Sequence, residues 1–462
     1  MTISLPQPGQ TSVIEASAGT GKTWAISDLA CRFIVGQAVP IAQLAIVTFT
    51  SAAVTEVRGR TQERLRRCAA MLTDPDPSHT NMDDESDSLW SDDPDLRRQR
   101  RDRARAALAD FDHAAIMTTH GFCDHLLSLL GVLADHDQSD TLVTDLTAMI
   151  TTTVADHYAQ TCRTGDPRFS YEEALSWSKA ALFAPSAAIV PTDRPEAAFI
   201  ETVRRSVEVK KRRAGVYTFD DMLLRCRASL INPVTAQLAR RRLSDAYPVL
   251  LVDEFQDTDS IQWDIIRAGF VDASTVVLIG DPKQSIYNFR GADVSAYLTA
   301  TRTAQTDTLD VNHRSSPSVV EAVASLTVGL ELGDPRITVK PVRTSMDTPS
   351  LVADVSESCG PWGLPLRLRV PADLTPRSVD EARRLIDADL ISDLRALLDR
   401  GPSYRGSPID PPRALRPDDV AILVATNSRG RLLLDRLAQA GVPAVFTGSG
   451  SVFDTDAARD WE

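Results

Sequence analysis

The sequence predicts an α/β fold with two lobes, each built on a parallel sheet. Short apolar runs alternate with amphipathic helical segments along most of the chain. A Gly-Lys-Thr triplet at 21–23 joins the first apolar run to a helix, and an Asp-Glu pair at 253–254 directly follows a later run. These observations indicate a nucleotide-binding protein, and one that hydrolyses the nucleotide if the acidic pair lies beside the triplet.

The first predicted element is a strand, a phosphate-binding loop and a helix. Val13 and Ile14 belong to the apolar run, and Ile26, Leu29 and Phe33 lie on one face of the helix. Small residues between them would let backbone N–H groups surround phosphate oxygens, and the helix N-terminus adds partial positive charge. The residues expected to bind the nucleotide are Ala16, Ser17, Ala18, Gly19, Thr20, Gly21, Lys22 and Thr23.

Two residues of this loop have expected roles, and a third departs from the general pattern. Lys22 would reach the β- and γ-phosphates, and the Thr23 hydroxyl would hold Mg²⁺. Ala16 stands where the general loop pattern has glycine.

The next segments continue the α/β pattern. Leu44–Val47 is a second strand, followed by a helix. Residues 73–95 are rich in Asp, Pro and Ser and are expected to form an exposed loop. The Arg-rich segment 97–109 is a predicted helix with two interpretations, a solvated face paired with the acidic loop or direct contact with phosphates. Ala115–Met117 is a third strand and leads into a helix that reaches about Leu133.

A helical region separates these strands from two more. From about 126 to 244 the pattern is helical and irregular, with no clear strand, which predicts a helical insertion. Val249–Val252 and Val276–Ile279 are buried strands that end in Asp253-Glu254 and Gly280-Asp281. Short apolar strands that alternate with helices favour a parallel sheet.

A second α/β unit is expected from about Thr306. Leu366, Leu368 and Val370 alternate with arginines, which predicts a strand. The remaining predicted elements are a helix over 379–398, a buried strand over 420–424, a helix over 428–440 and a further apolar segment over 444–446.

The Asp-Glu pair supplies the acidic groups that a phosphate loop needs for hydrolysis. Asp253 would contact Mg²⁺ directly or through water, and Glu254 could polarise the attacking water. The alternative is that the pair merely begins a helix, where acidic side chains are favoured. Coupled to Lys22, the pair favours nucleotide hydrolysis over binding alone.

Length, composition, net charge and cysteine spacing limit the class of protein further. The 462 residues allow two to four domains, and the composition is that of a soluble globular protein without a membrane span or signal peptide. The net charge of −13 neither requires nor excludes nucleic acid, because binding depends on the local groove. The six cysteines form no Cys-x-x-Cys pair, so buried reduced thiols and a cytoplasmic location are expected.

The motifs around the acidic pair resemble those of the UvrD/Rep class of superfamily 1 helicases. Residues 251–258 resemble the second motif of that class, and residues 280–293 resemble the third. Four stretches are most similar to the RecB subunit family of exodeoxyribonuclease V, namely EASAGTGKT (15–23), VTFTSAAVTEVRGR (47–60), TTHGFC (118–123) and VYTFDDML (216–223). The resemblance implies a P-loop NTPase with two RecA-like lobes and accounts for Ala16, which this class tolerates.

The resemblance also implies roles for single residues. Gln284 would sense the γ-phosphate and link hydrolysis to the DNA site, and Arg314 would stabilise charge on the transferred phosphoryl group. His313 stands where relatives place Tyr or Trp against adenine. Contacts with single-stranded DNA are implied for Thr48, Phe49, Thr50, His120, Tyr287, Phe289 and Arg290. Core packing is the alternative for Phe49 and Phe289.

Domain boundaries and a larger assembly follow from the same resemblance. The first lobe would comprise 1–125 and 245–305, the insertion 126–244, and an incomplete second lobe 306–462, which lacks the later helicase motifs. The implied function is the motor portion of an ATP- and Mg²⁺-dependent 3′–5′ DNA helicase in recombination and double-strand-break repair, with RecC- and RecD-like partner subunits. The alternatives are a truncated ATP- and DNA-binding fragment with weak turnover, and a solitary UvrD-type repair helicase.

Overall fold

The chain divides into two compact units. The first comprises residues 1–17 and 21–309, and the second comprises residues 18–20 and 310–462. The computed structural model describes residues 3–74, 86–134, 139–165, 168–183, 189–286, 294–302, 304–352, 360–370 and 378–447.

The first unit is built on a six-stranded sheet in which every pairing is parallel. The strand order is β3-β2-β6-β7-β1-β8, so the predicted parallel α/β fold is confirmed for this unit. The strands are β1 (Thr11–Ala16), β2 (Leu44–Thr48), β3 (Ala115–Thr118), β6 (Val249–Val252), β7 (Thr275–Gly280) and β8 (Gln305–Leu309).

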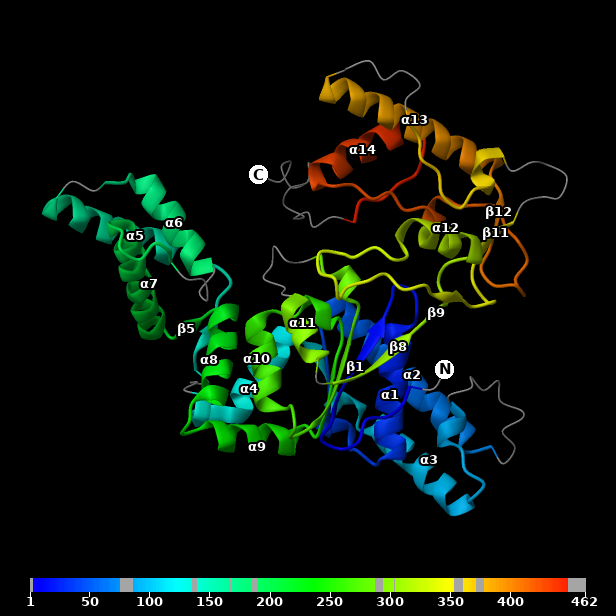
Figure 1. Ribbon diagram of the computed structural model, residues 1–462, viewed down its shortest axis with the longest axis horizontal. Helices are drawn as coiled ribbons and strands as arrows, with labels where there is room; N and C mark the ends of the chain where they lie inside the picture. The colour runs from blue at the N-terminus through cyan, green and yellow to red at the C-terminus, as the bar shows by residue number, and fades with distance from the viewer. Residues whose placement is uncertain are drawn as a thin grey trace, which may run out of the picture. The chain divides into compact units, whose positions relative to one another are not determined.

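Both faces of this sheet are buried, which explains why its central strands read as continuous apolar runs. Ile14, Ile46 and Leu251 belong to a core that also contains Ile26 and Leu29 of the first helix. Leu250 and Leu278, on alternate positions, are also fully buried. Figure 1 shows helices on the two sides of the sheet, with α1 (Lys22–Cys31), α2 (Ser51–Met71) and α3 (Pro94–Ala109) on one side and α4 (Thr119–Leu130), α8 (Phe219–Ile231), α9 (Ala236–Ala246) and α10 (Ser260–Gly269) on the other.

Strand β8 was not predicted. Its sequence, Gln-Thr-Asp-Thr-Leu, has little apolar character because it is the outermost strand and pairs only with β1. Register pairs such as Val13 with Thr306 fix it to the first sheet. The short helix α11 (Val294–Ala300) precedes it.

The predicted helical insertion contains a separate helix cluster. Helices α5 (Thr147–Thr164), α6 (Tyr171–Phe183) and α7 (Pro195–Ala214) bury a core around Val154, Phe169 and Val203. The expectation of no strand in this region was wrong at one place, because β4 (Thr141–Leu142) pairs in parallel with β5 (Val216–Tyr217). Two-residue strands leave no detectable period in the sequence, so they escape a pattern search.

Three partly buried arginines of the Arg-rich helix α3 contact neighbouring parts of the first unit. Arg103 donates to the carbonyl of Val35 at 3.0 Å, and Arg100 donates to the carbonyl of Leu89 at 2.7 Å. Arg97 stacks on the Trp90 ring, 4.7 Å from its centroid. Neither interpretation of this helix anticipated that its arginines bind backbone carbonyls.

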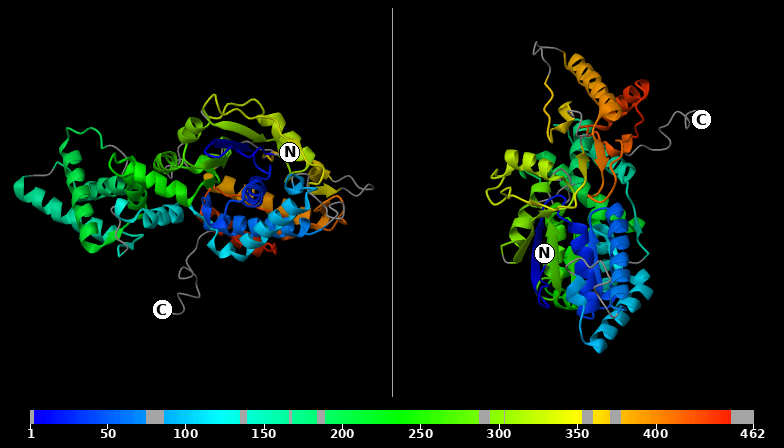
Figure 2. Two further views of the ribbon diagram at one scale, coloured as in Figure 1. Left: turned by 90° about the horizontal axis from the view of Figure 1, so that it is seen from below. Right: turned by 90° about the vertical axis from the view of Figure 1, so that its right-hand side faces the viewer.

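The second unit contains two short strand pairs and three helices among its described residues. β9 (Val311–Asn312) pairs in parallel with β10 (Arg343–Thr344), and β11 (Ser350–Val352) pairs antiparallel with β12 (Ser403–Arg405). The helices are α12 (Pro317–Thr327), α13 (Val379–Arg400) and α14 (Asn427–Gln439). Helices α13 and α14 lie side by side (Figure 2) around Leu394, Leu433 and Leu437, and both were predicted from the sequence.

The strands predicted in this unit are corrected by the structure. Residues 366–370, 420–424 and 444–446 are not assigned to any strand. Arg367 and Arg369 instead form ion pairs with Asp393 and Asp389 of α13, at 2.8 and 2.6 Å. In the second segment Val420, Ile422 and Val424 pack against the α13–α14 core. In 420–424 the alternation therefore marks packing against helices, whereas Leu366, Leu368 and Val370 of the first segment are exposed, and neither segment has a partner strand among the described residues.

Cysteine burial largely follows the sequence expectation. Cys31, Cys68, Cys123 and Cys226 are buried free thiols, whereas Cys162 is exposed. Within the described ranges, no helix is both long and apolar enough to cross a membrane, and no cluster of three or more His, Cys, Asp or Glu side chains could hold a metal ion.

Some sequence predictions lie outside the described residues. These are part of the acidic loop (75–85), the segment with Tyr287, Phe289 and Arg290, Cys359, and the final stretch 449–462.

Candidate functional site

The predicted phosphate loop connects β1 to α1. Gly19 and Gly21 have φ angles of 78° and 89°, a left-handed conformation that L side chains rarely adopt. Gly21 precedes Lys22, the first residue of α1, so the N-terminus of that helix faces the end of the loop. Ala16 is the last residue of β1 and is completely buried, and it is not among the described positive-φ residues, so its Cβ is tolerated.

The apex of the loop is held by the last residue of β9 and the residue after it. The Asn312 side-chain amide donates to the Ala18 carbonyl at 3.0 Å, and the His313 backbone N–H donates to the Gly19 carbonyl at 2.8 Å. A Cβ on Gly19 would lie 2.9 Å from Asn312 Nδ2 and 2.9 Å from the Cβ of Arg314. The predicted adenine and arginine positions, His313 and Arg314, are both exposed and directly flank this contact.

The Asp-Glu pair lies where β6 ends. Lys22 Nζ is 2.5 Å from Glu254 Oε2, with side-chain exposures of 12% and 32%. The structure therefore brings together the loop lysine and the predicted base from opposite ends of the first unit's sequence. Glu254 has a φ of 49°, a strained value for a non-glycine residue, and such strain concentrates at functional sites.

Burial changes the acidity of two carboxyl groups at this strand end. Burial, reinforced by the charge of Glu254, raises the pKa of Asp253 to about 7. Burial and the same charge raise the pKa of Asp257 to about 6. Crowded, buried carboxylates are stabilised by a bound cation, so this strand end fits a divalent metal held by Asp253 beside a phosphate loop. Thr23 is in the first turn of α1, and its backbone carbonyl accepts from the Ser27 hydroxyl.

A chain of hydrogen bonds leads from Glu254 to Gln284. Gln256 Nε2 donates to Glu254 Oε2 at 2.7 Å, and Gln256 Oε1 accepts from the Asp281 backbone N–H at 2.9 Å. Gln284 Nε2 in turn donates to Asp281 Oδ2 at 2.8 Å. The predicted base and the predicted γ-phosphate sensor are thus connected through two residues that the sequence argument did not select.

The residues expected to contact DNA occupy different surroundings. Thr48 is completely buried, and its hydroxyl has no hydrogen-bond partner in the part of the chain that the structure describes. The Thr50 side chain caps α2 by accepting from the Ala53 N–H at 3.1 Å. Phe49, between them, is half-buried. Tyr287, Phe289 and Arg290 lie outside the described residues.

His120 lies at the start of α4. Its ring packs edge-on against Phe219, with centroids 5.0 Å apart. Burial lowers the pKa of His120, while Asp259 and Asp220 partly oppose that effect. His120 is therefore a partly packed ring whose burial favours its neutral form.

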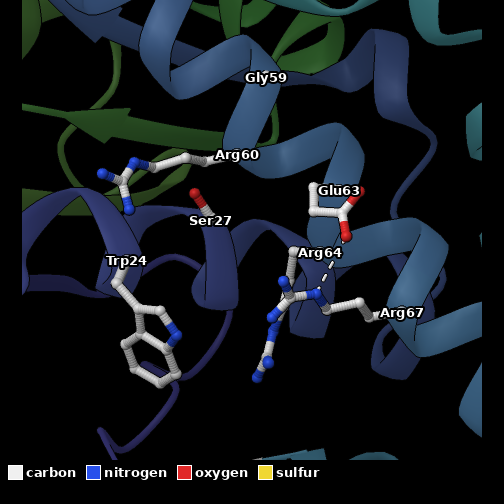
Figure 3. Close-up of a pocket in the computed structure, with 7 residues that line it drawn as sticks. All are labelled: Trp24, Ser27, Gly59, Arg60, Glu63, Arg64 and Arg67. Atoms are coloured by element: carbon white, nitrogen blue, oxygen red, sulfur yellow. Dashed lines mark hydrogen bonds and ion pairs between the residues drawn. The ribbon is translucent and has the colours of Figure 1, made fainter. Parts of the chain in front are cut away.

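A surface pocket lies between α1 and α2 (Figure 3). Its volume is about 220 Å³, and its lining consists of Trp24, Ser27, Gly59, Arg60, Glu63, Arg64 and Arg67. Arg67 pairs with Glu63 at 3.0 Å, and buried Arg64 pairs with Asp28 and stacks on Trp24. The arginines are engaged with neighbouring acids, and none of the predicted site residues lines this pocket.

Sequence reasoning missed four residues of the candidate site, Gln256, Asp257, Asp281 and Asn312. Three of them stand inside quoted motifs and were available as signals: Gln256 and Asp257 are two and three positions after Glu254, and Asp281 directly follows Gly280. Asn312 is two positions before Arg314, but only the structure shows that its side chain reaches the phosphate loop.

Comparison with known proteins identifies a family. Residues 3–305 match the UvrD/REP helicase N-terminal domain. The chain is 38% identical over 471 residues to the RecBCD enzyme subunit RecB of Mycolicibacterium smegmatis, and the match covers 99% of this chain. The corresponding subunit of Mycobacterium tuberculosis is 36% identical over 475 residues, again across 99% of this chain.

These matches cover nearly all of this chain but less than half of the two relatives. The chain spans 42% of the length of each of these two mycobacterial relatives. The RecBCD enzyme subunit RecB of Escherichia coli matches over 127 residues at 40% identity, which covers 27% of this chain.

Proposed function

This chain belongs to the UvrD/REP helicase family, and from that premise we propose that it is the motor portion of a RecB-like, ATP-dependent DNA helicase. The observation that carries the proposal is the ion pair between Lys22 and Glu254. It lies at the edge of the sheet where the carboxyl ends of β1 and β6 both lie. A phosphate loop and a strand-end carboxylate in contact are the two halves of a nucleotide-hydrolysis site.

Different residues of the first unit would have different roles in ATP hydrolysis. Backbone N–H groups of residues 16–21 would hold the phosphates of ATP, and Lys22 would exchange its contact with Glu254 for the β- and γ-phosphates. Glu254, so released, would orient the attacking water and accept its proton. Asp253 and the Thr23 hydroxyl would hold Mg²⁺, which when bound neutralises charge on the phosphates.

Two residues that follow the Asn312 contact have proposed roles at the nucleotide. His313 would stack on adenine, and Arg314 would stabilise charge on the γ-phosphoryl group. Their attachment to the loop apex through Gly19 and Asn312 supports this assignment. We assign residues 1–125 and 245–309 to a first RecA-like lobe, because β8 belongs to its sheet, residues 126–244 to an inserted helical domain, and residues 310–462 to the beginning of a second lobe.

Single-stranded DNA would be the track of this motor. Gln284 would connect γ-phosphate sensing to the DNA site, where Phe49, Thr50, His120, Tyr287, Phe289 and Arg290 are the proposed contacts. Buried Thr48 would support that surface from below. The relatives carry the name of a RecBCD enzyme subunit, so partners similar to RecC and RecD, and 3′–5′ movement in break repair, belong to the same proposal.

Steady-state ATP hydrolysis with and without single-stranded DNA tests the proposal. We expect DNA to stimulate hydrolysis at least about tenfold, and Lys22→Ala to abolish both rates because the phosphates lose their cation. Lys179→Ala, the same change on α6, serves as the matched control. ATP and DNA binding without stimulated turnover would instead support a binding fragment and contradict a motor.

A further inference from the structure

Gln256 lies at the centre of the candidate site without having an assigned role. The residue is only 1% exposed and belongs to the single turn of helix that follows Glu254. Its two side-chain polar atoms have different partners: Nε2 donates to Glu254 Oε2 at 2.7 Å, and Oε1 accepts from Asp281 N–H at 2.9 Å. A primary amide can donate to a carboxylate through its nitrogen and at the same time accept from a backbone N–H through its oxygen.

The opposite side of this contact is shaped to receive the amide. A Cβ on Gly280, the last residue of β7, would lie 2.6 Å from Gln256 Oε1 and 3.2 Å from the Gln256 backbone nitrogen. The Ser285 hydroxyl donates to the Gln256 carbonyl at 3.2 Å. The end of β7 and the turn after it therefore hold Gln256 from two directions.

The turn that holds Gln256 also holds Gln284. Asp281 is 2% exposed, and each of its two carboxylate oxygens has a different partner. Oδ2 accepts from Gln284 Nε2 at 2.8 Å, while Oδ1 lies 2.6 Å from Lys283 Nζ. Movement of the Asp281–Gln284 turn would thus be transmitted to the Gln256 amide through a backbone hydrogen bond.

We propose that Gln256 is a positioning residue that fixes the Glu254 carboxylate against the Asp281–Gln284 turn. The inference rests on the proposed function, because it assigns Glu254 the role of base. Glu254 is 32% exposed and its backbone is strained, so an undirected carboxylate would have space to turn away. The hydrogen bond from the Gln256 amide would hold the Glu254 carboxylate in one orientation. The attacking water molecule would then always meet the carboxylate in the same geometry.

The Gln256→Glu variant separates positioning from packing. The substitution keeps the shape and the oxygen that accepts from Asp281 N–H, but it replaces the donor to Glu254 with a carboxylate. Gln262→Glu is the matched control: Gln262 is 6% exposed in the same unit, and its hydrogen bond to the Asp259 N–H uses the oxygen that glutamate retains. The variants are compared by kcat for DNA-stimulated ATP hydrolysis, by ADP affinity and by melting temperature.

The inference predicts that Gln256→Glu lowers kcat at least about tenfold, with ADP affinity and melting temperature within the range of Gln262→Glu. An unchanged kcat would overturn it, and so would a parallel fall of kcat, affinity and melting temperature, which would mean packing alone. A wild-type chain that does not hydrolyse ATP would contradict the proposed function instead. In that case a crystal structure of Gln256→Glu decides: Glu254 displaced while residue 256 still binds Asp281 N–H supports positioning, and an unmoved Glu254 contradicts it.

Discussion

Lys22 and Glu254 are 232 positions apart in the sequence, yet the ammonium of one lies 2.5 Å from a carboxylate oxygen of the other. The contact follows from topology, because β1 and β6 flank β7 and all three strands point the same way. Parallel strands place their carboxyl ends at one edge, where ligands of open α/β sheets bind. The ion pair therefore marks the position at which phosphate and base would meet.

The loop apex gives a prediction about Gly19. Gly19→Ala places a Cβ within 2.9 Å of both Asn312 and Arg314, at a φ of 78°. We expect a loss of about 1–2 kcal/mol in the free energy of unfolding and at least a tenfold weaker nucleotide affinity. Chemical denaturation and titration with a fluorescent ADP analogue measure the two effects.

Gly329→Ala controls for the backbone alone. Gly329 has a φ of 85° but nothing within 4 Å of an added Cβ. Its substitution should reproduce part of the stability loss and none of the affinity loss. Equal nucleotide affinity in the two variants would show that the contact with Asn312 and Arg314 does not shape the loop.

The raised pKa of Asp257 predicts a pH-dependent stability. Its pKa rises from the ordinary value to about 6 in the folded chain, so the native state binds this proton more tightly than the unfolded chain does. The resulting stabilisation is complete below about pH 4 and is lost as pH rises through about 6. Asp257 Oδ1 also lacks a hydrogen-bond partner among the described residues.

Asp257→Asn should therefore stabilise the metal-free protein at pH 8 by on the order of 1 kcal/mol relative to wild type, after allowance for screening by solvent. The difference should shrink towards pH 4. Urea denaturation at several pH values measures it, with exposed Asp245→Asn on α9 as the control for removing an acid. A stability difference that does not vary with pH would contradict the assignment.

The arginines of α3 are predicted to stabilise the fold and not to bind nucleic acid. Arg103→Ala removes a charged donor from the carbonyl of Val35 and should cost about 1–2 kcal/mol of unfolding free energy. Arg98→Ala, at a side chain that is 63% exposed, should change stability by less than about 0.5 kcal/mol. For both variants, the slope of DNA affinity against salt concentration should equal that of wild type. A reduced slope for Arg103→Ala would show a phosphate contact.

The sequence was sufficient to predict the parallel sheet of the first unit, because buried strands such as Val249–Val252 are continuously apolar. It was not sufficient for β8, whose polar residues carry no burial signal, or for Val420–Val424, whose alternation reflects packing on α13 and α14. Lys22 and Glu254 could be paired in advance, because a loop and a strand end obey simple topology. The hydrogen bonds of Gln256 and Asn312 could not be predicted, because the partners of these side-chain amides are close to them only in the folded chain.

Single-turnover ATP hydrolysis by Glu254→Gln tests most directly whether Lys22 and Glu254 form a hydrolysis site. Loss of the base should slow the chemical step by about 100-fold or more, while ATP affinity stays equal to or above that of wild type because Lys22 is freed for the phosphates. A hydrolysis rate within about threefold of wild type, at unchanged ATP affinity, would contradict the account.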